Sequence, residues 1–371
     1  MSSGKIPALQ IGEYTADVPI VQGGMGVGIS LAGLASAVAN VGGIGVIATA
    51  GIGQFEPDLK INFKEANKRA LRKVIQETKA NTNGLIGVNI MVALSDFDEL
   101  VQCAVEEEAH VVFMGAGLPI RLPGTLPLDK LGKLKTKFVP IVSSGKAARL
   151  IFRSWAKQFN HIPDGVVVEG PLAGGHLGFR KEDIPNPDFS LEKILPEVID
   201  ALKPFEEKFD KKVPVIAGGG VYTGEDIYKY IQLGASGVQM GTRFVATDEC
   251  DASDVFKEMY VSCKKEDIIL IDSPVGLPGR AIRCDLFDRI ASGEKEKFKC
   301  PWKCLKTCDF KHVPYCIAHA LSQAKLGNMD EGFAFAGANT YRVDKIIPVK
   351  ELVETLKQEY ESVSATSGTL K

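Results

Sequence analysis

Two features are missing from this sequence: a long apolar run and an excess of one charge. No stretch of about 18 uninterrupted apolar residues occurs, so no transmembrane helix is expected. Residues 1–14 hold no basic region followed by a long apolar run, so no secretory signal is expected either. The 44 basic residues nearly balance the 46 acidic ones, and no basic stripe suggests nucleic-acid binding. We therefore expect a cytoplasmic protein that acts on a small molecule, with no nucleic-acid or membrane partner and with a homodimer as the candidate assembly.

Histidine is also scarce, with five residues, whereas glycine is abundant, with 38. A histidine in a glycine-rich loop is therefore easy to single out. The eight cysteines have no secretory context, so we expect free thiols or metal ligands rather than disulfides.

Short apolar segments recur along the first 240 residues and are predicted to be strands. These segments are 19–22, 44–48, 85–90, 110–114, 138–143, 165–169, 213–217 and 237–240. Segments with apolar residues at helical spacing, or loops long enough to cross over, separate them. The predicted helices are 30–40, 63–79, 96–108, 146–157, 191–209 and 223–233, with two more at 316–326 and 349–361.

Continuous apolar strands are typical of a parallel sheet that is buried on both faces. Eight such units close into a barrel, so the pattern favours an α/β protein with a (β/α)8 TIM barrel. An open doubly wound sheet also alternates strands and helices and is the alternative. The connections after the first and fourth predicted strands fit the alternation of strands and helices least well.

Three local signals refine the helix ends. Ser30 is the predicted N-cap of the helix over 30–40. Thr223 and Asp226 have the spacing of a capping box, with Asp in place of the usual Glu. The stretch 361–371 is rich in Ser and Thr and is expected to fray.

The pattern of alternating elements stops after the eighth predicted strand. We predict a flavin-binding barrel over 1–247, an insertion over 248–342, and a C-terminal helix with a frayed tail over 343–371. The insertion contains seven of the eight cysteines. Loops of this length are usually functional lids or disordered segments, and the apolar and aromatic content of this one favours an ordered lid over the C-terminal mouth of the barrel.

Glycine-rich segments follow several predicted strands, and in a barrel they all converge on one face. The first is 22–26, and the second is 170–178, which carries His176. The third comprises 217–221 and 239–243, after the seventh and eighth strands. Barrels commonly bind phosphate there through main-chain N–H groups, so this pair predicts a phosphate site.

Two side chains near this face have more than one interpretation. His176 lies in a loop without apolar periodicity, which favours a functional role over a structural one. Lys146 follows the fifth strand and is either a cation that faces the mouth or a solvated lysine in the first turn of a helix.

Together these motifs resemble the nitronate monooxygenase family, formerly called 2-nitropropane dioxygenases. The motifs are Gly23–Gly26, Gly87–Asn89, Ala173–His176, Ala217–Gly220 and Gln239–Thr242. The resemblance implies non-covalent FMN in a (β/α)8 barrel. It places the phosphate on Gly219, Gly220, Gly241 and Thr242, with Gln239 and Met240 alongside. It places Gly24, Met25, Asn89, Glu169, Ala173 and Gly174 near the ring or ribityl chain.

Glu169 departs from the family pattern, because many relatives have Gln there. A carboxylate could not donate a hydrogen bond to a flavin oxygen unless it were protonated. His176 matches the active-site histidine of the family, which would remove a proton from a nitroalkane or hold the oxygens of a nitronate. The implied activity is oxidation of alkyl nitronates by O2 to carbonyl compounds and nitrite.

Two other functions are compatible with the same motifs. The flavin-dependent enoyl-acyl-carrier-protein reductases share the motif order, so an NAD(P)H-dependent flavin oxidoreductase is one alternative. A non-enzymatic flavin or metal sensor is the other, because a fold alone does not fix function.

A cysteine cluster lies in the insertion, at Cys300, Cys304, Cys308 and Cys316. If residues 300–308 formed a helix, the first three thiols would share one face. Four thiolates could bind zinc or an iron–sulfur cluster, although the spacing matches neither a paired zinc pattern nor a ferredoxin run. A reduced cysteine-rich helix without metal is the alternative, and the cluster is atypical of nitronate monooxygenases.

Overall fold

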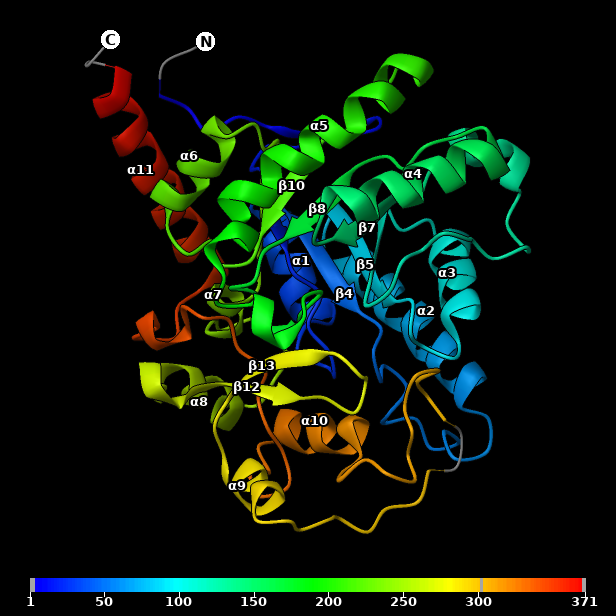
Figure 1. Ribbon diagram of the computed structural model, residues 1–371, viewed down its shortest axis with the longest axis vertical. Coiled ribbons are helices and arrows are strands. Elements are labelled where there is room, and N and C mark those ends of the chain that lie inside the picture. The colour runs from blue at the N-terminus through cyan, green and yellow to red at the C-terminus, as the bar shows by residue number, and fades with distance from the viewer. Residues whose placement is uncertain (1–3, 301–302, 369–371) are drawn as a thin grey trace.

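The computed structural model describes residues 4–300 and 303–368 of the chain. Its centre is a barrel of parallel strands surrounded by helices (Figure 1). The barrel strands are β3 (Ile20–Gln22), β4 (Ile44–Ala48), β5 (Leu85–Met91), β6 (Val111–Gly115), β7 (Lys137–Val142), β8 (Val166–Glu169), β10 (Val215–Gly218) and β11 (Gly237–Met240). Strand β11 pairs with β3 and closes the barrel. The predicted TIM barrel is confirmed, and closure excludes the open sheet.

Helices follow most of the barrel strands and cover the outside of the barrel. They are α1 (Ala32–Asn40), α2 (Phe63–Asn81), α3 (Phe97–Glu106), α4 (Gly145–Phe159), α5 (Leu191–Phe209), α6 (Gly224–Gln232) and the short α7 (Thr242–Val245). The bounds of α1 to α6 agree with the predicted ones to within a few residues, whereas α7 was not predicted. Among the described residues, no helix has both the length and the apolar character needed to cross a bilayer.

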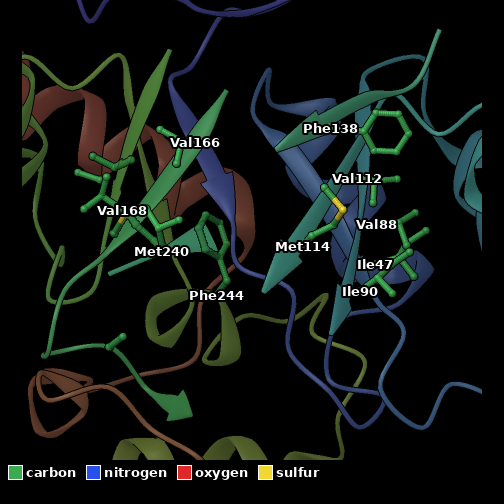
Figure 2. Close-up of a cluster of buried hydrophobic side chains, with 14 of the residues drawn as sticks. Ile47, Val88, Ile90, Val112, Met114, Phe138, Val166, Val168, Met240 and Phe244 are labelled. Atoms are coloured by element: carbon green, nitrogen blue, oxygen red, sulfur yellow. The ribbon is translucent and has the colours of Figure 1, made fainter. Parts of the chain in front are cut away.

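The apolar side chains of the barrel strands form two separate clusters because neighbouring residues point to opposite faces. One set packs in the barrel interior with Leu9 and Ile11 of an N-terminal hairpin, formed by β1 (Leu9–Ile11) and β2 (Tyr14–Ala16). The other set packs against the surrounding helices, and Figure 2 labels Ile47, Val112 and Val168 among them. Burial on both faces explains why the strands are continuously apolar.

The connection from β6 to β7 differs from the others because it contains no α-helix. A 3-10 turn, η1 (Leu128–Lys133), takes its place. The preceding loop contains three prolines, which disfavour a helix: Pro119, Pro123 and Pro127. The loop is held by α4, where the Trp155 indole N–H donates to the Pro119 carbonyl at 2.7 Å.

The predicted N-cap of α1 is wrong, whereas the capping box is confirmed. The α1 N-terminus is capped by Asp251, whose carboxylate accepts from the N–H groups of Leu31 at 2.7 Å and Leu34 at 3.1 Å. Ser30 instead accepts from the Met25 N–H at 2.9 Å. At α6, Thr223 and Asp226 form the reciprocal capping box.

The described part of the C-terminal stretch is helical, and its predicted fraying stays a prediction. Helix α11 runs over Val349–Gly368 and packs against α6. Tyr360 is buried, and its ring centroid lies 5.5 Å from that of Tyr228. The last three residues of the predicted tail, 369–371, lie outside the described residues.

The segment after β11 folds beside the C-terminal face of the barrel (lower part of Figure 1). It contains α8 (Asp254–Ser262), η4 (Lys265–Asp267), β12 (Ile268–Asp272), β13 (Pro278–Ile282), α9 (Asp285–Ala291), α10 (Ile317–Leu326) and η5 (Thr340–Arg342). Strand β13 pairs with β12 and with β9 (Gly175–His176), which belongs to the loop after β8. That loop continues through η2 (Lys181–Asp183) and η3 (Pro187–Phe189). The division of the chain at residue 247 stays a prediction, because this small sheet joins both parts.

Candidate active site

A cavity of about 260 Å³ lies at the carboxyl ends of the barrel strands. All the residues expected to contact a flavin line it. These are Gly24, Met25, Asn89, Glu169, Ala173, Gly174, Gly219, Gly220, Gln239, Met240, Gly241 and Thr242, together with His176. The structure therefore brings the predicted site residues together, while their individual roles stay predictions.

The loop after β3 packs closely against β5. A Cβ atom on Gly24 would lie 2.3 Å from the Cβ of Asn89, so a side chain there would displace Asn89. The Asn89 carbonyl is anchored, since it accepts from the Thr49 N–H at 3.1 Å and from its hydroxyl at 2.9 Å. In the described chain the Asn89 side-chain amide has no protein partner and is free to bind a ligand.

The loop after β10 presents main-chain donors to the cavity. Gly219 and Gly220 have φ values of +90° and +94°, a region that favours glycine. Within residues 4–300 and 303–368, no protein acceptor pairs with the N–H of Gly219 or Gly220. Asn339 holds the loop by donating from Nδ2 to the Gly220 carbonyl at 2.8 Å. Successive unpaired N–H groups form a concave donor set that suits a phosphate.

His176 is fixed by the inserted segment. Its Nε2 atom lies 2.7 Å from the Ser273 hydroxyl oxygen, and its ring meets the Phe335 ring edge-on at 4.9 Å between centroids. Burial lowers the pKa of His176 to about 4, because the charged imidazolium is poorly solvated there. His176 is therefore neutral at neutral pH.

The loop that carries His176 is also clamped by Arg280 of β13. The buried guanidinium donates to the carbonyls of Pro171, at 2.7 Å, and of Ala173. Burial lowers the pKa of Arg280 to about 10, and the group stays protonated at neutral pH. Main-chain pairing of Arg280 with Gly175 adds a second restraint.

Glu169 ends β8 and lines the cavity without any hydrogen-bond partner in the described part of the chain. Burial raises the pKa of this carboxyl to about 7. A substantial fraction is therefore protonated near neutral pH and able to donate a hydrogen bond. This removes the chemical objection to Glu169 as a flavin contact.

Sequence reasoning missed the contribution of the insertion to this site. Phe256, Tyr260, Phe335, Gly337 and Asn339 also line the cavity. No local motif marks them, because they reach the site through tertiary folding.

A second, apolar cavity of about 60 Å³ adjoins the first. Ala50, Met91, His176 and Leu321 line both cavities. The second cavity extends between the β4–α2 loop and α10, so the space beside His176 can accept an apolar group.

Lys146 is exposed and lines neither cavity, so the interpretation as a cation facing the mouth is wrong. It lies in the first turn of α4, as the alternative interpretation had it.

The predicted metal site is not found. Among the described residues, no group of three or more Cys, His, Asp or Glu side chains is arranged to hold a metal ion. The expected helix over 300–308 is absent where the structure describes that stretch, since Leu305 instead forms a bridge with Leu94. The four cysteines are free thiols, and burial with neighbouring thiols raises the pKa of Cys304 to about 12.

Comparison with known proteins adds independent findings. The family described as nitronate monooxygenase matches residues 9–359. A (3aS,4S,5R,7aS)-5-hydroxy-7a-methyl-1-oxo-octahydro-1H-indene-4-carboxyl-CoA dehydrogenase from Mycobacterium tuberculosis is 28% identical, over 75% of this chain and 67% of that protein. A probable nitronate monooxygenase from Staphylococcus saprophyticus is 23% identical, over 79% of this chain and 83% of that protein. The solved structure of FabK from Thermotoga maritima is similar, with a TM-score of 0.72 and 29% identity over 95% of this chain and 96% of that one.

Proposed function

Since this chain belongs to the nitronate monooxygenase family and is a flavin-dependent oxidoreductase, we propose that it oxidises alkyl nitronates with O2 to carbonyl compounds and nitrite. The observation that carries the proposal is the neutral imidazole of His176 in the same cavity as the glycine loops. A nitronate has already lost its acidic proton, so its oxidation needs a hydrogen-bonding group and no strong base. Because the family consists of enzymes, membership in it also disfavours the interpretation of this chain as a non-enzymatic flavin or metal sensor.

The residues present fit FMN as the flavin. The N–H groups of Gly219 and Gly220 are unpaired donors at the end where the phosphate is expected. The Asn89 amide and the Glu169 carboxyl are polar groups without protein partners among the described residues, and both line the same cavity. When bound, the flavin would supply the oxidation of the substrate and the reduction of oxygen.

The protein's own groups orient the substrate. Phe335 and the pairing of β9 with β13 fix the His176 ring beside the cavity. An N–H of neutral imidazole can donate to a nitronate oxygen without the cost of a buried cation. The apolar cavity next to His176 would take the alkyl group of the substrate and exclude water from it.

The first test mixes the purified protein, without oxygen, with propyl nitronate or with NADH or NADPH. We expect rapid loss of the visible flavin absorbance with the nitronate alone. Loss of absorbance with a nicotinamide only would overturn the proposal.

A second test replaces His176 with alanine. We expect bound flavin to be retained and kcat with propyl nitronate to fall by about 100-fold or more, since the group that orients the nitronate is removed. His319→Ala is the matched control, because His319 lies on the surface and pairs with Glu331. Unchanged turnover in the His176 variant would remove His176 from the mechanism.

A second candidate function is an NAD(P)H-dependent flavin oxidoreductase such as an enoyl-acyl-carrier-protein reductase. It is favoured by the identity to a carboxyl-CoA dehydrogenase, which at 28% exceeds the 23% to a probable nitronate monooxygenase. A neutral imidazole donor also suits a thioester carbonyl. The anaerobic experiment distinguishes the two candidate functions, because only the second predicts loss of flavin absorbance with NADH or NADPH.

A further inference from the structure

The hydrogen bond between His176 and Ser273 determines more than the position of the imidazole ring. Ser273 lies in the turn between β12 and β13 and is 8% exposed. Its N–H donates to the Leu277 carbonyl at 3.2 Å, and its carbonyl accepts from Gly276 at 2.9 Å. Because the turn is closed by these main-chain bonds, the direction of the Ser273 hydroxyl group is restricted.

The serine oxygen already has one donor. The Val275 N–H donates to the Ser273 Oγ at 3.3 Å. A hydroxyl has one proton to donate and two lone pairs to accept with. Among the described residues, the only other hydrogen-bond partner of Oγ is His176 Nε2 at 2.7 Å, so this nitrogen is the one acceptor for the hydroxyl proton.

The opposite arrangement leaves a buried donor without an acceptor. If Nε2 carried hydrogen, it would donate to Oγ, and the serine proton would have no acceptor among the described residues. A buried unpaired hydroxyl is costly, so the arrangement with Ser273 as donor is favoured. Neutral imidazole then carries its hydrogen on Nδ1.

We propose that Ser273 is a positioning residue that holds His176 as the neutral tautomer with hydrogen on Nδ1. In the described chain, Nδ1 has no protein partner, and His176 lines both cavities. The free N–H is then a donor for a ligand oxygen, and His176 does not act as the base. Among residues 4–300 and 303–368, no carboxylate is hydrogen-bonded to the ring to favour the charged form.

This assignment narrows the substrate class, and it rests on the proposed function because it takes His176 to contact the substrate. A donor at this place recognises an oxygen that carries negative charge, such as that of a nitronate, or the oxygen of a polarised carbonyl. It does not remove a proton from a neutral nitroalkane. The expected preference is therefore for preformed nitronates over the corresponding neutral nitroalkanes.

The direct test is a long-range ¹H–¹⁵N correlation spectrum of the flavin-bound protein with ¹⁵N-labelled histidine, recorded at neutral pH. The His176 signals among the five histidines are identified by their loss in the His176→Asn variant. We expect a protonated Nδ1 and an unprotonated Nε2. A protonated Nε2, or two protonated nitrogens, would overturn the proposal without any need for a Ser273 variant.

The kinetic test compares Ser273→Ala with Ser273→Thr, which keeps the hydroxyl group. Loss of one hydrogen bond corresponds to about a 3- to 10-fold fall in kcat with propyl nitronate for the alanine variant, with KM little changed. The alanine variant should also lose the wild-type ¹⁵N pattern, and the threonine variant should restore both. Equal flavin content in the variants shows that they are folded.

The outcomes separate this inference from the proposed function. If His176→Ala abolishes turnover while Ser273→Ala leaves turnover and the ¹⁵N pattern unchanged, only the role of Ser273 is refuted. If the nitronate is not oxidised by the wild-type protein but the ¹⁵N pattern is as expected, the tautomer assignment stands and the proposed function fails.

Discussion

Gly279 lies directly opposite His176 in the antiparallel pairing of β13 with β9. The absence of a side chain at Gly279 leaves room for Phe335, whose ring contacts the imidazole. A Cβ on Gly279 would lie 2.9 Å from Cε1 of Phe335 and 3.3 Å from Cγ1 of Ile271. The strand next to the candidate catalytic residue is therefore supplied by the insertion and not by the barrel.

Gly279→Ala tests this relationship. We expect Phe335 to be displaced from the His176 ring and kcat to fall by about 3- to 10-fold, because a small shift of a positioned group lowers turnover. Flavin content should not change. Gly124→Ala is the matched control, since nothing lies within 4 Å of a Cβ placed there. Equal kcat values for the two variants would show that the Phe335 contact is dispensable.

Gly220→Asp tests the assignment of the phosphate site. A carboxylate beside the predicted phosphate should weaken flavin binding by about 100-fold or more, because two like charges would meet at short range. The measurement is the ratio of flavin to protein after purification, followed by a flavin titration. Gly293→Asp is the control for backbone strain, since φ is +95° there against +94° at Gly220. A Gly220→Asp protein with a full complement of flavin would contradict the assignment.

Glu169→Gln tests the protonation state of the buried carboxyl. The pKa of Glu169 rises from an ordinary value of 4.5 to about 7 in the folded protein. The folded state therefore binds more protons than the unfolded state between these pH values, and stability is lost as pH rises from 4.5 through 7. Glutamine has no such cost, so the variant should gain stability relative to wild type as pH increases.

The measurement is the difference in Tm between the Glu169→Gln and wild-type proteins at pH 5 and pH 8, with flavin bound. We expect the Tm of the glutamine variant, relative to that of wild type, to be about 3 °C higher at pH 8 than at pH 5. His176 contributes with the opposite sign, because its pKa is lowered to about 4 and its contribution is lost as pH falls below 6.5. Since both proteins contain His176, that contribution cancels. A difference that does not vary with pH would refute the raised pKa.

Much of the barrel follows from the sequence because its determinants are local. Each strand is a short apolar run, glycine adjoins or ends every strand except β7, and each helix from α1 to α6 has an apolar face at helical spacing. The predicted bounds of β4, β11 and α5 match the structure residue for residue. The glycine loops and His176 were found for the same reason, because ends of parallel strands converge wherever a barrel closes.

Where long-range contacts compete with local signals, local sequence patterns did not predict the structure that forms. Ser30 looks like the cap of α1, but the carboxylate of Asp251, 220 residues beyond Leu31 in the chain, accepts from the N–H groups of Leu31 and Leu34. The cysteine run at 300–308 has helical spacing, yet Leu305 pairs with Leu94 instead. The stretch 361–368 has weak local signals, yet it continues helix α11, in which Glu359 accepts from the Gly224 N–H of α6 at 2.6 Å.

The sequence by itself determined the barrel, the glycine loops and the histidine, because each depends on residues that are neighbours in the chain. Only the tertiary structure decided how that histidine is held and protonated. Ser273 and Phe335 lie 97 and 159 residues away from His176 in sequence, and no periodicity links them to it. Burial of His176, which lowers its pKa, likewise involves Ser273 and Phe335 of the insertion.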